Sequence, residues 1–229
     1  MKVGRDKRAK VAVVIAAYNE EARVGKTVRG VIAAGWPWVI VVDDGSRDKT
    51  VAIAKAAGAK VILQESNQGQ GAALRRGIKA AVAASAVAVV TYDADGQFLP
   101  KEIDSVAAPV LAGEVDVVLG SRFTGRTVNL TRRKRVVLRL AIWFTRLVSR
   151  VPVTDTHNGF RCFSRTAAKG INIHFNRMEH ASEILDEIRK LRLRMTEVPV
   201  TIIYHEEGQH PGRSISMGLR ILWWKLTGL

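Results

Sequence analysis

The feature that most constrains the fold is the alternation of short apolar runs with helical patterns in the first half of the chain. Short and mostly apolar runs, rich in β-branched residues, occupy residues 11–16, 39–42, 60–63, 87–91 and 115–119, and segments with helical periodicity separate them. Strands without polar alternation are buried on both faces, and strands that alternate with helices form parallel sheets. The sequence therefore predicts an α/β fold with a mostly parallel sheet and helices on both faces.

A polar cluster follows each apolar run. The five clusters lie at residues 18–20, 43–46, 67–71, 93–97 and 120–122. In open α/β sheets, ligands bind outside the carboxyl ends of the strands. We therefore expect the five polar loops to converge on one edge of the sheet and to form the functional site there.

The second half of the chain departs from this alternation. Its pattern predicts a basic amphipathic helix over residues 131–150, a short strand near Phe163, a helix over residues 179–191 and a strand over residues 195–203. A second amphipathic helix is expected over residues 214–229. A chain of 229 residues, 47% of them hydrophobic, can bury one large core. We interpret residues 1–229 as a single domain.

The most informative polar cluster contains two carboxylates separated by one residue, Asp93 and Asp95, followed by Gln97. Mg²⁺ and Mn²⁺ prefer such sparse sets of hard oxygen ligands, with positions left open for phosphate. Asp43 and Asp44 end a neighbouring strand, so four carboxylates are expected at one edge, and their repulsion favours a bound cation or a donor-rich ligand. The alternative, a carboxylate that caps the following helix, accounts for one of them at most.

Two common nucleotide-binding motifs are absent from the sequence. No Gly-x-x-x-x-Gly-Lys-Ser/Thr segment occurs, which excludes a P-loop. Residues 69–71 lack the full Gly-x-Gly-x-x-Gly pattern and follow the third strand, which disfavours a dinucleotide-dependent dehydrogenase. The sequence instead predicts a metal-dependent site for a donor that carries a diphosphate.

Five ordered motifs resemble those of a known family. They are Ala-Ala-Tyr-Asn-Glu at 16–20, Val-Asp-Asp-Gly-Ser at 42–46, Asn-x-Gly-x-Gly at 67–71, Asp-Ala-Asp-Gly-Gln at 93–97 and Gly-Ser-Arg at 120–122. Together they resemble the inverting glycosyltransferases of family 2, which have the GT-A fold. Residues 155–161 and 179–183 look like the branch that transfers hexoses to dolichyl or polyprenyl phosphate, so the resemblance extends over nearly the whole chain.

The resemblance implies roles for individual residues. The residues implied for nucleotide-sugar binding are Ala16, Tyr18, Glu20, Val42, Asp44, Asp93, Ala94, Asp95 and Arg122. The residues implied as ligands of Mg²⁺ or Mn²⁺ are Asp93, Asp95 and Gln97, and those implied for the acceptor phosphate are Arg122, Arg126, Arg213 and Ser214. The expected catalytic residues are Asp95, Arg122 and Asp155.

Two features of this assignment leave alternatives open. A phosphate acceptor is already ionised near neutral pH and needs positioning, whereas a sugar-hydroxyl acceptor needs a general base, for which Asp155 is the candidate. Asp155 could instead be a loop carboxylate paired with Arg161.

The sequence departs from the family pattern at two positions. Ala16 stands where the family usually has Pro, and Ile215 stands where a Lys is common. We expect Arg213 to supply the positive charge of that missing Lys.

The positive charge of the chain points to a membrane surface. Lys and Arg outnumber Asp and Glu by 36 to 21, a formal net charge of +15, and residues 118–153 contain nine basic residues and no acidic one. The helix expected at 131–150 combines a basic stripe with apolar faces that include Trp143 and Phe144, a composition typical of helices on anionic lipid surfaces. A solvated basic helix face is the alternative. Nucleic acid is disfavoured because no nucleic-acid-binding motif accompanies the basic run.

The predicted activity is transfer of a hexose from a nucleotide sugar to dolichyl or polyprenyl phosphate. Mannose from GDP-mannose is favoured over glucose from UDP-glucose. The alternatives are a soluble family 2 transferase acting on a sugar hydroxyl and a basic surface-binding module without catalysis. Because no apolar run reaches about 18 residues and the polar start of the chain resembles no signal sequence, we expect a cytoplasmic protein attached peripherally to the inner membrane face. The oligomeric state stays open.

Overall fold

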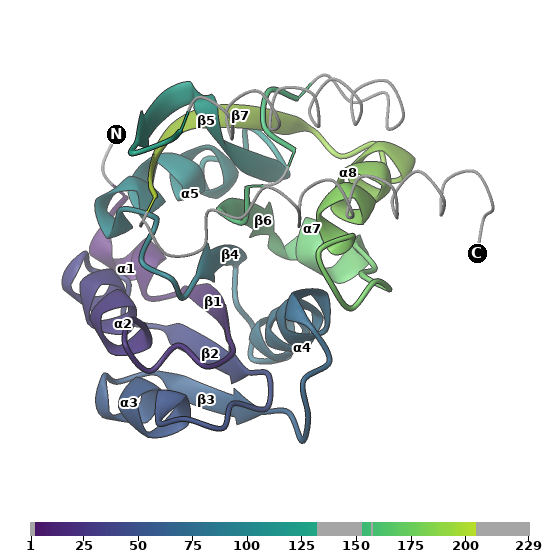
Figure 1. Cartoon of the computed structure of the whole chain (residues 1–229). Helices are drawn as coiled ribbons and strands as arrows, with labels where there is room; N and C mark the ends of the chain where they lie inside the picture. Colours follow the sequence, from purple (N-terminus) through teal and green to yellow (C-terminus); the bar gives the residue numbers. More distant parts are fainter. Residues whose placement is uncertain (1–2, 132–152, 157, 205–229) are drawn as a thin grey trace.

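The fold is built around one sheet. The structure is a computed structural model that describes residues 3–131, 153–156 and 158–204. Within these residues the strands are β1 (Val11–Ala17), β2 (Val39–Asp43), β3 (Lys60–Leu63), β4 (Ala88–Asp93), β5 (Val117–Val128), β6 (Arg161–Ser164) and β7 (Met195–Ile203). They lie in the order β3-β2-β1-β4-β6-β5-β7 (Figure 1).

The sheet is mostly parallel, as predicted. β1 pairs in parallel with β2 and β4, β2 with β3, and β5 with β7. β6 is the exception, since it runs antiparallel to β4 and to β5. The parallel pairing of β2, β1 and β4 brings their carboxyl ends to the same edge of the sheet.

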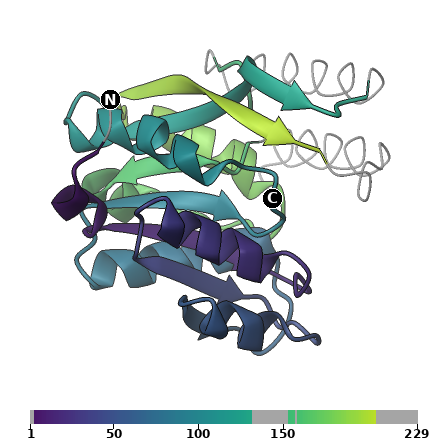
Figure 2. The same ribbon diagram turned by 90° about the vertical axis from the view of Figure 1, so that its left-hand side faces the viewer.

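Helices cover both faces of the sheet (Figure 1 and Figure 2). The helices α2 (Val24–Ala33), α3 (Thr50–Ala56) and α5 (Ile103–Leu111) pack on one face, and α4 (Gln70–Ala83), α7 (Arg165–Gly170) and α8 (His180–Lys190) pack on the other. Two short helices, α1 (Arg5–Arg8) and η1 (Pro100–Glu102), complete the described elements. In β1, Val13 belongs to the first apolar core and Val14 to the second. An uninterrupted apolar strand thus serves two cores, because successive side chains point to opposite faces.

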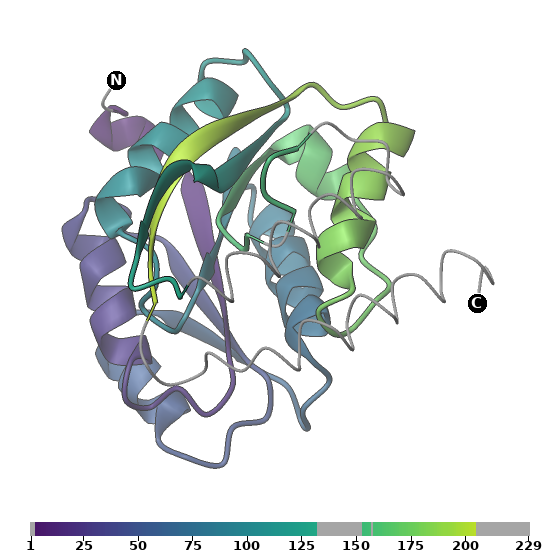
Figure 3. The ribbon, with the colours of Figure 1, turned by 45° about the horizontal axis from the view of Figure 1, so that its top comes forward.

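β5 continues well beyond the strand expected at residues 115–119. It is buried from Val117 to Arg122, and from there to Val128 its residues alternate between half-buried and exposed positions. This outer part pairs with β7 after a register shift between Ser121 and Arg126 (Figure 3). Polar residues are tolerated there because one face of the two-stranded ribbon is exposed. Arg122 therefore lies within a strand, where the sequence predicts a loop.

The predicted lipid-facing helices lie outside the described residues. This holds for the basic helix at 131–150, apart from residue 131, for the helix at 214–229, and for the acceptor residues Arg213 and Ser214. Among the residues that are described, no helix is both long enough and apolar enough to cross a membrane.

Candidate active site

Three neighbouring strands bring predicted donor-binding residues into one row. In the register of the sheet, Ala16 of β1 is the partner of Val42 of β2 on one side and of Asp93 of β4 on the other. Each lies at or next to the carboxyl end of its strand. The expectation that polar loops meet at one edge of the sheet is therefore confirmed for these three strands.

Asp93 is the carboxylate of this row, and neighbouring residues hold it on two sides. The side-chain amide of Gln70, at the start of α4, donates a hydrogen bond to Asp93 Oδ1 over 2.9 Å. The backbone of Gly159 packs so closely on the other side that an added Cβ would lie 2.6 Å from Asp93 Oδ2. Burial, together with the charge of Asp95, raises the pKa of Asp93 to about 7 against the opposing charges of two arginines. Two carboxylates thus share a poorly solvated edge, where a cation would relieve their repulsion.

Asp95 is held by the turn that follows it. Its Oδ1 accepts a hydrogen bond from the backbone N–H of Gln97 over 3.0 Å, and its Oδ2 accepts one from the Gln97 side-chain amide over 2.7 Å. The pKa of Glu20, in the first polar cluster, is raised by burial and then by the charge of Asp95. We call Glu20, Asp93, Asp95 and Gln97 the donor half of the site.

The donor half fits a divalent cation in charge and in ligand type. Among the described residues, no three His, Cys, Asp or Glu side chains converge in a metal-binding arrangement. Asp93, Asp95 and the amide oxygen of Gln97 stay the predicted ligands. Mg²⁺ and Mn²⁺ use such sparse sets and complete their coordination with water and phosphate oxygens.

The two carboxylates that follow one another at the end of β2 have different partners. Asp44 is buried and accepts hydrogen bonds from the backbone N–H groups of Gln68 and Gly69 over 2.7 and 2.8 Å, so it anchors the loop after β3. Asp43 accepts from the backbone N–H of Ser46 through Oδ2, and its buried Oδ1 has no hydrogen-bond partner among the described residues. Neither caps α3. The sequence assigns the donor contact to Asp44, whereas Asp43 is the one with an unpaired oxygen.

A buried ion pair forms the second half of the site. Arg122 donates to Asp155 Oδ2 from its Nε over 2.6 Å and from its backbone N–H over 3.0 Å, and a terminal nitrogen donates to the Tyr204 hydroxyl over 2.6 Å. Burial alone would lower the pKa of Arg122, but Asp155 and Tyr204 raise it above its usual range. Asp155 therefore pairs with Arg122, and the alternative ion pair with Arg161 does not form. We call Arg122, Asp155 and Tyr204 the acceptor half.

Most of the sequence that builds the two halves, with the exception of Tyr204, matches a known family model. The model described as Glycosyl transferase family 2 matches residues 12–171, which include the whole donor half and the Arg122–Asp155 pair. The chain belongs to glycosyltransferase family 2. It is therefore a glycosyltransferase, as the five ordered motifs indicate.

Two relatives and one solved structure are similar to this chain. The UDP-N-acetylglucosamine–dolichyl-phosphate N-acetylglucosaminyltransferase of Methanococcus voltae is 32% identical over 93% of this chain and 93% of its own. The polyprenol monophosphomannose synthase of Mycolicibacterium smegmatis is 32% identical over 70% of this chain and 64% of its own. Glucosyl-3-phosphoglycerate synthase of Mycobacterium tuberculosis, solved with Mn²⁺, UDP-glucose and phosphoglyceric acid, has a TM-score of 0.74 at 22% identity over 95% of this chain and 78% of that chain. This last likeness concerns the fold alone, and it confirms the GT-A fold.

Three residues that support this family 2 site have no role in the sequence predictions. Gln70 binds Asp93, and Tyr204 binds Arg122. Glu197 of β7 accepts the backbone N–H groups of Thr154 and Asp155 over 2.8 to 3.1 Å, and so fixes the loop that carries Asp155. Gln70 lies inside a recognised motif and could have been named. Glu197 and Tyr204 carry no local signal, because only the pairing of β7 with β5 brings them to the site.

The side chains of Tyr18, Arg126 and Ala94 form no described hydrogen bond or ion pair with either half. Tyr18 and Arg126 are exposed, and Ala94 is buried, with its carbonyl oxygen accepting the hydroxyl of Thr27 over 3.0 Å. Their roles in donor and acceptor binding stay predictions.

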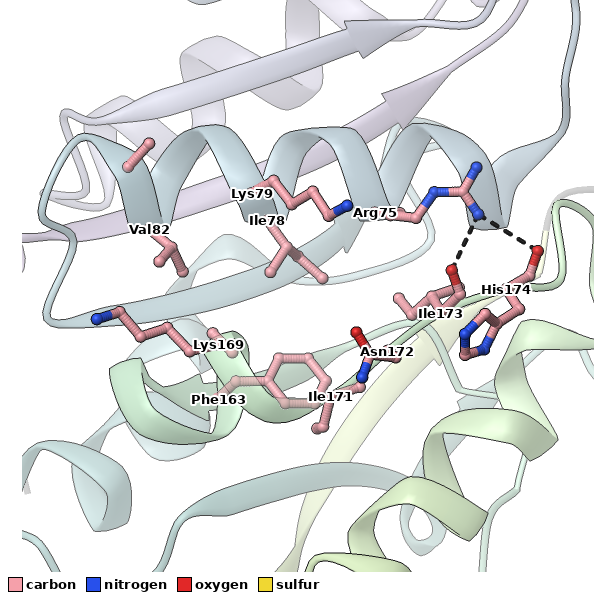
Figure 4. A pocket seen from close by; sticks show the side chains of 12 residues that line it. Arg75, Ile78, Lys79, Val82, Phe163, Lys169, Ile171, Asn172, Ile173 and His174 are labelled. Atoms are coloured by element: carbon pink, nitrogen blue, oxygen red, sulfur yellow. Dashed lines mark hydrogen bonds between the residues drawn. The ribbon is translucent and has the colours of Figure 1, made fainter.

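A cavity of about 510 Å³ lies between α4 and residues 168–174, and none of the predicted site residues lines it (Figure 4). Its wall combines apolar side chains such as Phe163 with basic ones such as Lys79. At one end, Arg75 donates hydrogen bonds to the carbonyl oxygens of Ile173 and His174 over 2.9 and 3.3 Å. The cavity is therefore separate from the donor and acceptor halves.

Proposed function

We propose that this family 2 glycosyltransferase transfers a sugar from a nucleotide sugar to dolichyl or polyprenyl phosphate, with Mg²⁺ or Mn²⁺ as cofactor. The observation that carries the proposal is the close packing of the loop that carries Asp155 against Asp93 of the donor half. The loop from Asp155 to Arg161 packs its Gly159 backbone against Asp93, and the Gly159 carbonyl accepts the Thr91 hydroxyl of β4 over 2.7 Å. An acidic, metal-compatible half thus adjoins a half with a buried arginine. The names of the two relatives support a lipid phosphate as acceptor.

The donor half suits a departing nucleoside diphosphate. Negative charge develops on this leaving group as the bond to the sugar breaks, and catalysis requires that charge to be stabilised. A divalent cation held by Asp93, Asp95 and Gln97 supplies this stabilisation when it is bound. The two hydrogen bonds from Gln97 keep the Asp95 carboxylate oriented within its turn.

The acceptor half suits a phosphate monoester. Such a group has a second pKa of about 6 and is mostly ionised at neutral pH, so it needs positioning more than deprotonation. Arg122 provides a permanent positive charge, and Asp155 and Tyr204 fix the orientation of its guanidinium. In this proposal Asp155 positions Arg122 and does not remove a proton from the acceptor.

The identity of the sugar is the finer part of the proposal. The sequence favours mannose from GDP-mannose, with glucose from UDP-glucose as the alternative. The two relatives are named for N-acetylglucosamine and for mannose, so the donors to compare are GDP-mannose, UDP-glucose and UDP-N-acetylglucosamine. Mannose stays the first candidate for the sugar. The lipid phosphate acceptor is the better supported part of the proposal, because both relatives are named for a lipid phosphate product or substrate.

The test is a transfer assay with each radiolabelled donor, Mn²⁺ and a polyprenyl phosphate, followed by counting label in the lipid extract. We expect label from one donor, no transfer after chelation of the metal, and a rate at least about 100-fold lower in Asp95→Ala, because that variant loses charge stabilisation in the transition state. Asp116→Ala is the matched control, since Asp116 pairs with Arg194 just before β5 begins, and we expect it to retain the wild-type rate.

Two results would contradict this function. Transfer of label to a water-soluble sugar, with none to lipid, would support the alternative of a hydroxyl acceptor with Asp155 as base. A wild-type rate in Asp95→Ala would remove the metal role.

A further inference from the structure

Arg161 is a buried cation to which neither the sequence motifs nor the proposed mechanism gives a role. It is the first residue of β6, and its neighbours in the sheet are Thr91 of β4 and Leu119 of β5. Only 3% of its surface is exposed. Among the described residues, no acceptor forms a hydrogen bond or a close ion pair with its guanidinium. Its N–H donors are therefore unmatched within the described protein.

The pairing of β6 with β4 and β5 places Arg161 between the two halves of the site, because Asp93 ends β4 and Arg122 lies in β5. Burial lowers its pKa to about 10, and the carboxylates of Asp93 and Asp155 both oppose this effect. The side chain therefore stays charged near neutral pH. Asp93 belongs to the donor half and Asp155 to the acceptor half, so Arg161 is within electrostatic reach of both.

Comparison with Arg122 shows why the unmatched donors matter. The sequence assigns phosphate binding to Arg122, but that guanidinium already donates to Asp155 and Tyr204. A guanidinium has five N–H donors. None of the Arg161 nitrogens is a fully buried atom without a partner among the described residues, so its unmatched donors lie where a ligand can reach them. The planar, charged fork of an arginine matches two oxygens of a phosphate group well. A phosphate that enters the site would satisfy donors of Arg161 that the described protein leaves unpaired.

We propose that Arg161 binds a substrate phosphate by donating hydrogen bonds to its non-bridging oxygens. The phosphate belongs either to the nucleoside diphosphate of the donor or to the lipid acceptor, because Arg161 adjoins both halves. This inference rests on the proposed function for the identity of those two substrates. It assigns to β6 a residue that contacts substrate, in addition to the residues predicted after β1, β2, β4 and β5.

Arg161→Met tests the proposal, because it removes the guanidinium and keeps an unbranched apolar side chain. Calorimetric titrations compare wild type and variant with GDP and UDP in the presence of Mn²⁺, and with guanosine and uridine as phosphate-free probes. For the acceptor, farnesyl phosphate is compared with its phosphate-free counterpart farnesol. We expect Arg161→Met to weaken one phosphate-bearing probe of these pairs by roughly 10- to 100-fold, as for a lost charged hydrogen bond, without changing its phosphate-free counterpart.

The pair that responds identifies the substrate. Selective loss of nucleoside diphosphate binding would place the contact on the donor, and selective loss of farnesyl phosphate binding would place it on the acceptor. Arg165→Met is the matched control, since Arg165 is half-buried in neighbouring α7 and donates to the Ala86 carbonyl oxygen over 3.0 Å. We expect the control to bind every probe like the wild type.

Unchanged affinity for GDP, UDP and farnesyl phosphate would overturn the proposal. An equal loss for a probe and its phosphate-free counterpart would also overturn it, because that result indicates a structural role. If circular dichroism shows that Arg161→Met does not fold, Arg161→Lys carries the same test with a smaller, phosphate-selective loss expected. These titrations measure binding alone. They therefore decide the role of Arg161 even if the transfer assay shows that the acceptor is not a lipid phosphate.

Discussion

The missing side chain of Gly159 lets the loop that carries Asp155 lie against the Asp93 carboxylate. A Cβ at this position would come within 2.6 to 2.9 Å of the carboxylate atoms of Asp93. Asp93 cannot easily move aside, because it is half-buried at the end of β4 and Gln70 donates to its Oδ1. The close approach of this loop to the Asp93 carboxylate thus depends on one glycine.

We expect Gly159→Ala to lower kcat/KM by roughly 10- to 100-fold with little change in the thermal unfolding midpoint. The added methyl group must displace the Asp93 carboxylate, and a shift of about 1 Å in a catalytic site can cost about 100-fold in rate. Steady-state kinetics and differential scanning calorimetry measure the two quantities. Gly4→Ala is the control, since a Cβ there would meet nothing within 4 Å. Wild-type kinetics in Gly159→Ala would show that the position of Asp93 is not critical.

The residues of the donor half could be predicted from the sequence because most of them lie in one short segment. Asp93, Asp95 and Gln97 follow a single apolar strand, and the direction of that strand decides where they lie. The acceptor half was predicted less completely. Asp155 and Arg122 were both named, but the partner of Asp155 depends on how β5, β6 and β7 pair, which no single segment encodes.

α4 connects the donor half to the sheet. Its first residue, Gln70, binds Asp93, and in its middle Gly77 faces β1 and β2. A Cβ on Gly77 would lie 2.3 Å from Val14 Cγ1 and 2.9 Å from Val42 Cγ2. Helical periodicity between the apolar runs at 60–63 and 87–91 predicted a helix there, and α4 lies between them. The close approach of helix and strands was not predicted, because periodicity gives the buried face of a helix and not its distance from the sheet.

We expect Gly77→Ala to lower the free energy of unfolding by about 1–3 kcal/mol, the usual cost of overpacking a well-packed core. The higher helix propensity of Ala, worth about 1 kcal/mol, offsets only part of this loss. Urea denaturation measures the change. Lys79→Ala, at an exposed position of the same helix, should stay within about 0.5 kcal/mol of wild type. An unchanged or higher stability of Gly77→Ala would mean that the two valines repack without cost.

Sequence patterns predicted the position of most strands but not the direction or full length of all of them. The buried parallel strands were predicted within a few residues, since apolar runs mark them directly. The antiparallel direction of β6 was not predicted, because a short strand has the same composition in either direction. The outer half of β5 was missed because its polar residues belong to a half-exposed ribbon that exists only once β7 pairs with it.

The chain as a whole combines an acidic site with a large basic surplus. The net charge is +15, and nine of the basic residues fall in the acid-free stretch 118–153. Arg122 and Arg126 of this stretch belong to β5, and the others lie outside the described residues. An acceptor carried by a lipid is presented at an anionic surface, where each Lys or Arg contributes about 1 kcal/mol. We therefore keep the proposal that this stretch holds the enzyme on the membrane.

Reversing three of these charges tests the membrane proposal. We expect the triple variant Arg132→Glu, Arg135→Glu and Arg139→Glu to lose most of its sedimentation with vesicles that contain an anionic phospholipid, because attraction turns into repulsion. Transfer to acceptor embedded in such vesicles should fall with it, whereas transfer to a short-chain acceptor in solution should persist. The differences between this variant and the wild type in vesicle sedimentation and in transfer to embedded acceptor should become smaller as salt is added, because salt screens the charges.

The matched control reverses the same number of charges elsewhere. Lys26, Arg29 and Lys55 are exposed on α2 and α3, and their replacement by Glu changes the net charge equally. If the control variant loses vesicle binding to the same extent, net charge and not the 118–153 stretch drives attachment. If the first variant still binds vesicles like the wild type, the stretch does not attach the enzyme to the membrane at all. Only a loss confined to the first variant is consistent with a basic segment that holds the acceptor half against the lipid surface.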